Sequence, residues 1–145
     1  MKKFLIFVML ALFVLPAAQA VAQEAEKEPG HIFIVTTHKV YMPTDGNAEE
    51  RDAMLKEMFE IDKKNTYIVS QRELRHMWGA DNRDWVIITE YKSWADIEAA
   101  NKMSNELYEK HWPDKEKRDA FFQKLFRYFP KHSDEIYREM PEYRR

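Results

Sequence analysis

The sequence of 145 residues contains no cysteine, and this absence removes several classes of protein at once. Without thiols the chain has no disulfides, no thiolate nucleophile, no cysteine-based zinc site and no iron–sulfur cluster. Only three glycines occur, so the chain also has no glycine-rich loop of the kind that surrounds phosphates. The sequence therefore argues against nucleotide-phosphate chemistry.

An excess of charge of one sign is missing as well. The 23 Lys and Arg are nearly balanced by 25 Asp and Glu, which argues against a nucleic-acid binder with a broad basic surface. Hydrophobic residues make up 45% of the chain and aromatic residues 14%, which is enough to build a buried core. The composition predicts one small globular domain.

Long hydrophobic runs are scarce, and the longest one, at positions 4–15, comprises twelve residues. Two lysines precede it, and Ala18-Gln19-Ala20 follows as a small-x-small pattern. A membrane span needs about twenty residues, so we interpret residues 1–20 as a secretory signal peptide. We expect cleavage after Ala20 or after Ala22, a periplasmic or secreted product, and no membrane attachment after cleavage.

Periodicity divides the rest of the chain into elements. Residues 21–30 are polar and end in Pro-Gly, which indicates a flexible lead-in to a single domain at residues 31–145. Runs rich in β-branched and aromatic residues predict strands at 32–41, 67–78, 85–92 and 135–140. Helical spacing of apolar residues predicts helices at 48–64, 93–111 and 115–129, with Ser93 capping the second helix.

This β-α-β-β-α-α-β order predicts an α+β fold in which helices cover one face of a four-stranded antiparallel sheet, a ferredoxin-like arrangement. The first strand is apolar on both sides, with Ile32 and Ile34 on one face and Phe33 and Val35 on the other. Because the helices cover only one face, the second face needs another cover. We therefore expect a homodimer whose two sheets pack face to face.

The strand at 85–91 and the helix opening Lys92-Ser93-Trp94-Ala95-Asp96 carry a resemblance to a known group. With this element order the chain resembles the dimeric α+β-barrel superfamily, which includes antibiotic-biosynthesis-type monooxygenases, haem-degrading monooxygenases and many uncharacterised members. The resemblance implies a dimeric barrel with a pocket between sheet and helices. The helix at 115–129 is an addition to the minimal members, and it either covers the pocket or extends the interface.

One group of polar residues on the predicted hairpin suggests a ligand site. Arg72 and His76 are four residues apart on one face of the predicted strand, and Glu90 lies on its partner strand. With aromatic walls from Trp85 or Tyr91, such a cavity suits a small anionic, aromatic or amphiphilic ligand. The alternative is that these charges only form ion pairs across the hairpin, Glu73 or Glu90 with Arg72 or Arg75.

Two histidines are candidate catalytic residues. His38 shares a strand face with Ile32 and Ile34, so it is either a buried titratable group or a solvated residue near a strand end. By the resemblance, His38 or His76 would act as the base of a cofactor-free monooxygenase, with Arg72 or a tryptophan positioning the substrate.

Cofactors and metals have weaker support. His111, at the end of the second helix, is a candidate haem ligand by the resemblance, or a partner for the last helix carbonyls. His132, Ser133 and Asp134 occur in one short segment, where we expect turn or cap residues before the last strand. We expect no metal site and no cofactor.

Three functions follow from these observations. The first is an exported protein that binds a small molecule between sheet and helices. The second is a cofactor-free monooxygenase-like enzyme. The third is a structural or interaction module that acts through its dimer interface.

Overall fold

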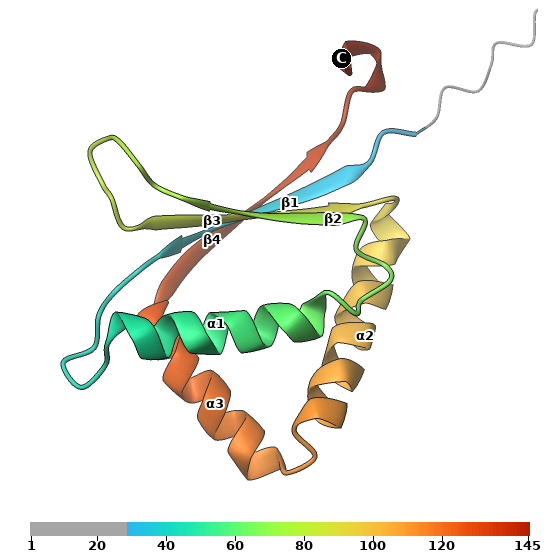
Figure 1. Cartoon of the computed structure of the whole chain (residues 1–145). Coiled ribbons are helices and arrows are strands. Elements are labelled where there is room, and N and C mark those ends of the chain that lie inside the picture. Colours follow the sequence, from blue (N-terminus) through green and yellow to red (C-terminus); the bar gives the residue numbers. More distant parts are fainter. Residues whose placement is uncertain (1–28) are drawn as a thin grey trace, which may run out of the picture.

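The computed structural model describes residues 29–145, so the predicted signal peptide and most of the lead-in lie outside the described residues. Four strands and three α-helices follow one another in the predicted order (Figure 1). They are β1 (Ile32–Lys39), α1 (Ala48–Asp62), β2 (Ser70–Arg75), β3 (Asp84–Tyr91), α2 (Trp94–His111), α3 (Lys115–Tyr128) and β4 (Lys131–Arg138), with a 3₁₀ turn at Pro141–Tyr143. In this part of the chain no helix is long and apolar enough to cross a membrane.

The strands form one antiparallel sheet in the order β2-β3-β1-β4, and the three helices lie on the same side of it (Figure 1). This is the ferredoxin-like α+β architecture that the sequence predicted. The register pairs Ile34 with Thr89 on β3 and with Ile136 on β4. Because residues that face each other across antiparallel strands lie on the same side, the register assigns every strand residue to the helix side or to the open side.

The core lies on the helix side of β1 and β3. One cluster joins the sheet to α1 and α3, and it consists of Met54, Trp85, Leu125, Tyr128 and Phe129. A second cluster joins the sheet to α2 through Ile32, Tyr91 and Ala100. The additional helix α3 is therefore part of the core. Its Tyr128 hydroxyl also donates to Glu50 Oε2 on α1 at 2.7 Å.

Three details of the prediction are wrong. β2 ends at Arg75, so Met77 and Trp78 belong to the loop that follows it. β4 begins at Lys131, so His132, Ser133 and Asp134 are strand residues and not turn or cap residues. Asp134 accepts a hydrogen bond from Thr36 Oγ1 of β1 at 2.7 Å.

The start of α2 gives the third correction. Ser93 has the extended backbone of an N-cap residue, but its side chain makes no capping hydrogen bond to an amide. Its hydroxyl donates to Asp96 Oδ2 at 2.7 Å. Asp96, which we expected to stabilise the positive end of the helix dipole, is thus the partner of the Ser93 hydroxyl, and the free amides of the first turn receive no side-chain cap.

Candidate functional site

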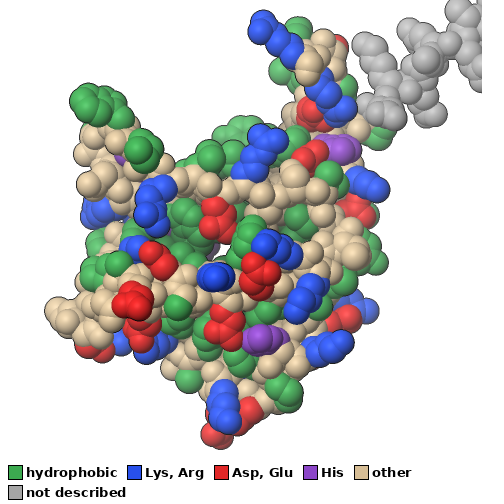
Figure 2. Space-filling model, viewed as in Figure 1, with side chains coloured by type: hydrophobic (Ala, Val, Ile, Leu, Met, Phe, Trp, Pro, Cys, Tyr) green, Lys and Arg blue, Asp and Glu red, His purple; other side chains and the backbone are tan. Residues whose placement is uncertain are grey.

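The helix side of the sheet is hollow along α1, and two adjoining cavities lie there. Figure 2 shows the surface hollowed between the sheet and α1, with side chains of both charges around the opening. The first cavity, here called the arginine pocket, has a volume of about 370 Å³. Its lining residues are Val40, Arg51, Leu55, Glu73, Arg75, Asn82, Asp84, Trp85 and Phe129.

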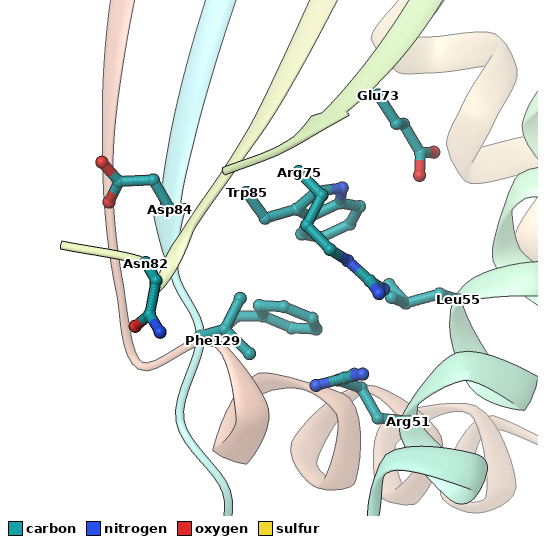
Figure 3. Close-up of a pocket in the computed structure, with 9 residues that line it drawn as sticks. Arg51, Leu55, Glu73, Arg75, Asn82, Asp84, Trp85 and Phe129 are labelled. Carbon is teal, nitrogen blue, oxygen red and sulfur yellow. The ribbon is translucent and has the colours of Figure 1, made fainter. Parts of the chain in front are cut away.

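Two arginines from different elements extend into the arginine pocket. Arg75 is the last residue of β2, and Arg51 lies in the first turns of α1; their guanidinium groups point into the same space (Figure 3). Arg51 is held by Asp52, whose Oδ1 accepts from its Nε at 2.8 Å. Arg75 has no hydrogen bond or ion pair with any of the described residues. The pocket therefore offers a guanidinium whose five donors are free for a ligand.

The wall of the arginine pocket is aromatic. The rings of Trp85 and Phe129 lie side by side, with centroids 4.8 Å apart, and both residues are buried. Phe129 follows directly after α3, so the additional helix supplies one side of the pocket. A planar ring could stack on this wall while a charged substituent reaches the arginines.

The acidic groups of the arginine pocket do not neutralise Arg75. Asp84 pairs with Lys39, which also contacts Asp81 at 3.0 Å. Burial raises the pKa of Glu73, although hydrogen bonds from the Trp85 and Gln71 side chains oppose that shift. The raised pKa means that the surroundings disfavour a charged Glu73.

The second cavity, here called the carboxyl pocket, has a volume of about 430 Å³ and lies towards the other end of α1. Asp62 is its only acidic lining residue, and Asp62 Oδ1 accepts a hydrogen bond from the Tyr108 hydroxyl at 2.6 Å. Burial raises the pKa of Asp62 and of Tyr108. The other lining residues are Thr36, His38, Met58, Ile68, Gln71, Ile87, Thr89, Tyr91, Asn101, Ser104 and Asn105.

His38 lines the carboxyl pocket and points to the helix side, which answers the question that the sequence left open. Its ring stacks on Trp85 with centroids 5.2 Å apart. Its Nδ1 atom is buried without a hydrogen-bond partner among the described residues. Burial lowers the pKa of His38, and the neighbouring His132 lowers it further.

The residues predicted to form one ligand site are divided between the two faces of the sheet. Trp85 and Tyr91 lie on the helix side, where both are buried. Arg72 and Glu90 lie on the open side, where they line a cavity of about 580 Å³. Glu90 accepts from Ser70 there and contacts His31 Nδ1 at 2.5 Å.

His76 joins neither group. The strand ends one residue before it, and its backbone amide donates to the Asp84 carbonyl at 3.1 Å. Its Nε2 atom is buried without a partner among the described residues. Gly79, whose φ is +140°, lies against this ring, and a Cβ atom there would come within 2.8 Å of Nε2. The hairpin loop thus encloses His76, which lies outside β2 and lines neither the arginine pocket nor the cavity that Arg72 lines.

The histidines considered as haem or metal ligands, His111 and His132, each lie beside a carboxylate. His111 Nε2 lies 2.9 Å from Glu57 Oε1 across the helix layer, so one ring nitrogen already has a partner. His132 Nε2 lies 3.4 Å from Asp134 on β4. Between residues 29 and 145 no group of three His, Asp or Glu side chains could hold a metal ion.

Arg51 and Arg75 were missed as site residues because nothing in the sequence distinguishes them. Arg51 occurs in a helix with charged residues on all sides, and Arg75 alternates with other polar residues of β2. Only the position of α1 opposite the end of β2 brings these two residues together.

Comparison with known proteins gives relatives in structure only. No protein-family model and no curated protein matches the chain. A dabb family protein with a ferredoxin-like fold from Mesorhizobium loti superposes with a TM-score of 0.52 at 13% identity, covering 77% of this chain and 98% of that one. A putative antibiotic biosynthesis monooxygenase from Caulobacter crescentus gives 0.51 at 12%, covering 78% and 92%.

A third solved structure is the cofactor-independent oxygenase SnoaB of Streptomyces nogalater, with a TM-score of 0.50 at 10% identity, covering 76% of this chain and 93% of that one. The chain has the ferredoxin-like fold of this group. The resemblance noted in the sequence is thereby confirmed at the level of the fold. Identities this low leave ligand and reaction to the residues of this chain itself.

Proposed function

We propose that this protein binds a small aromatic anion in the arginine pocket. The observation that carries the proposal is the Arg75 guanidinium, which has no partner among the described residues and shares a cavity with the buried rings of Trp85 and Phe129. A guanidinium matches the geometry of a carboxylate, and the rings offer a flat apolar surface to the rest of the ligand. This location differs from the Arg72 site that the sequence predicted.

The test uses 2-naphthoate as probe and neutral 2-naphthamide as its uncharged counterpart. We expect calorimetry to show binding of the naphthoate, and Arg75→Gln to weaken it about tenfold or more, because a hydrogen bond to a charged group contributes roughly 1.5–3 kcal/mol. Binding of the amide should change little. Equal affinity of the wild-type protein for both probes would contradict the proposal.

Arg72→Gln is the matched control. Arg72 lies on the same strand as Arg75, three residues earlier, but on the open face of the sheet. We expect naphthoate binding to survive this change. If Arg72→Gln weakens binding and Arg75→Gln does not, the site is the one predicted from the sequence, on the open face.

We further propose that the protein acts outside the cytoplasm, as the signal-peptide pattern of residues 1–20 indicates. Expression of the whole chain in a secreting bacterial host should yield a product whose intact mass corresponds to cleavage after Ala20 or Ala22. A product that retains Met1 to Leu15 would contradict export by this route.

A cofactor-free oxygenase is the second candidate, and His38 favours it. Burial lowers its pKa, and the resulting neutral imidazole lines the carboxyl pocket, where it could accept a proton from a substrate. A substrate for this chemistry must form a carbanion that reacts with oxygen. Oxygen uptake with an electron-rich hydroxynaphthoate, abolished by His38→Gln, would support the enzyme; uptake equal to that of buffer would argue for a binding protein.

A further inference from the structure

Helix α1 carries residues of opposite charge at the two ends of the hollow. Four of its residues line the two cavities, at spacings of four, three and four: Arg51, Leu55, Met58 and Asp62. Residues with these spacings lie along one side of a helix. From the first to the last, α1 therefore presents a cation, two apolar side chains and an acid to the sheet.

On the opposite side of the hollow, β2 also contributes to both cavities. On β2, Glu73 lines the arginine pocket and Gln71 lines the carboxyl pocket. Residues two apart on a strand are about 7 Å apart and face the same way, so the two cavities adjoin. Arg51 and Asp62 are eleven residues apart, or about 16 Å along the helix axis. One elongated molecule could reach from one end to the other.

The acid end lacks a cation. Asp62 uses Oδ1 to accept from Tyr108, and no described residue donates to its other oxygen, Oδ2. The remaining polar groups of this pocket are amides and hydroxyls, including Gln71, Asn101 and Asn105. Oδ2 is open to water in the pocket, and a hydroxyl or amino group of a ligand would take the place of that water.

Resting on the proposed function, we propose that the ligand is an elongated aromatic acid with a hydrogen-bond donor, a hydroxyl or an amino group, at the end opposite its carboxylate. The carboxylate binds Arg75 in the arginine pocket. The aromatic body passes Leu55 and Met58. The donor reaches the free oxygen of Asp62.

The test compares 4′-hydroxybiphenyl-4-carboxylate with biphenyl-4-carboxylate by calorimetry. We expect the hydroxylated probe to bind the wild-type protein about tenfold more tightly. Asp62→Asn should remove that gain and leave the affinity for the plain probe within about twofold. Glu60→Gln is the control, because Glu60 lies on the same helix but is exposed and pairs with Lys63; the gain should persist in this variant.

The outcomes separate this inference from the proposed function. If both probes bind through Arg75 with equal affinity, or if the gain persists in Asp62→Asn, the inference is overturned and the proposed function stands. If neither probe binds the wild-type protein, both are overturned. Because the two probes are first compared on the wild-type protein, the inference stays testable even where Asp62→Asn does not fold.

Discussion

At the scale of single residues, His38 has surroundings that disfavour a charge. Its ring is packed between Trp85 and Phe129, at centroid distances of 5.2 and 5.5 Å. Burial and the neighbouring His132 lower its pKa, and only the more exposed Asp134 acts in the opposite direction. The folded protein therefore favours the neutral imidazole.

This lowered pKa predicts a loss of stability in acid. As the pH falls through the ordinary histidine pKa of about 6.5, the unfolded chain takes up a proton that folded His38 resists, so the free energy of unfolding decreases. Thermal unfolding between pH 7.5 and 5.0 should show a smaller loss for His38→Gln than for the wild-type protein. His111→Gln, which removes an exposed histidine, should keep most of the wild-type loss. Identical pH dependence in wild type and His38→Gln would contradict the assignment.

At the scale of elements, the first turns of α1 and α2 differ in how their free amides are satisfied. Asn47 Oδ1 accepts from the Glu50 amide at 2.8 Å, so α1 has a side-chain cap. Ser93 precedes α2 but donates to the Asp96 carboxylate. Both residues are of types that commonly cap helices, but only the Asn47 side chain accepts a hydrogen bond from an amide of its helix.

The two helix starts make a matched pair of variants. Asn47→Ala should lower the free energy of unfolding by about 1 kcal/mol, the usual effect of losing a capping side chain. Ser93→Ala should lower it by clearly less, because no amide loses its partner. Urea unfolding of both variants measures the difference. A larger effect at Ser93 than at Asn47 would show that the Asp96 hydrogen bond matters more than the cap.

The elements that could be predicted are those whose apolar residues alternate or repeat. β1 and β3 are central strands with apolar residues on both faces, and their predicted limits are nearly right. β4 is an edge strand, and its first four residues, Lys131 to Asp134, are exposed and polar, so nothing in them indicates a strand. β4 forms because β1 offers hydrogen-bonding partners along the whole length of β4. The sequence of β4 alone does not contain this information.

The candidate site could be predicted from local sequence even less than β4 could. Alternation along β2 separates Arg72 from Arg75 but does not say which side the helices cover. That choice depends on how α1 and α3 pack against the sheet, and it places Arg75 and not Arg72 in the arginine pocket. Trp85, which the sequence suggested as an aromatic wall, lines the arginine pocket, and its neighbours there come from α1, from β2 and from the connecting segments.

At the scale of the whole molecule, the open face of the sheet is the surface that residues 29–145 leave uncovered. Helices lie only on the opposite side (Figure 1). The open face carries Phe33, Val35 and Ile88 around its cavity, and Leu74 and Tyr137 are 49% and 54% exposed. Apolar surface of this kind on a small protein is usually covered by a partner.

We therefore predict a homodimer with the open faces in contact. Light scattering at tens of micromolar should give about twice the mass of the chain. Val35→Glu places a charge in the middle of this face and should shift the protein to monomers, because a buried unpaired carboxylate is unfavourable. Ala53→Glu adds the same charge at an exposed position of α1 and should leave the dimer intact.

The predicted dimer interface and the proposed ligand pockets lie on opposite faces of the same sheet, and this separation makes the two proposals independently testable. A Val35→Glu monomer that still binds naphthoate would show that each chain carries a complete site in its own helix layer. If the monomer loses binding while Ala53→Glu keeps it, the arginine pocket depends on the partner through the sheet. A wild-type protein that stays monomeric would contradict the dimer, because no second copy of the chain would then cover the open face.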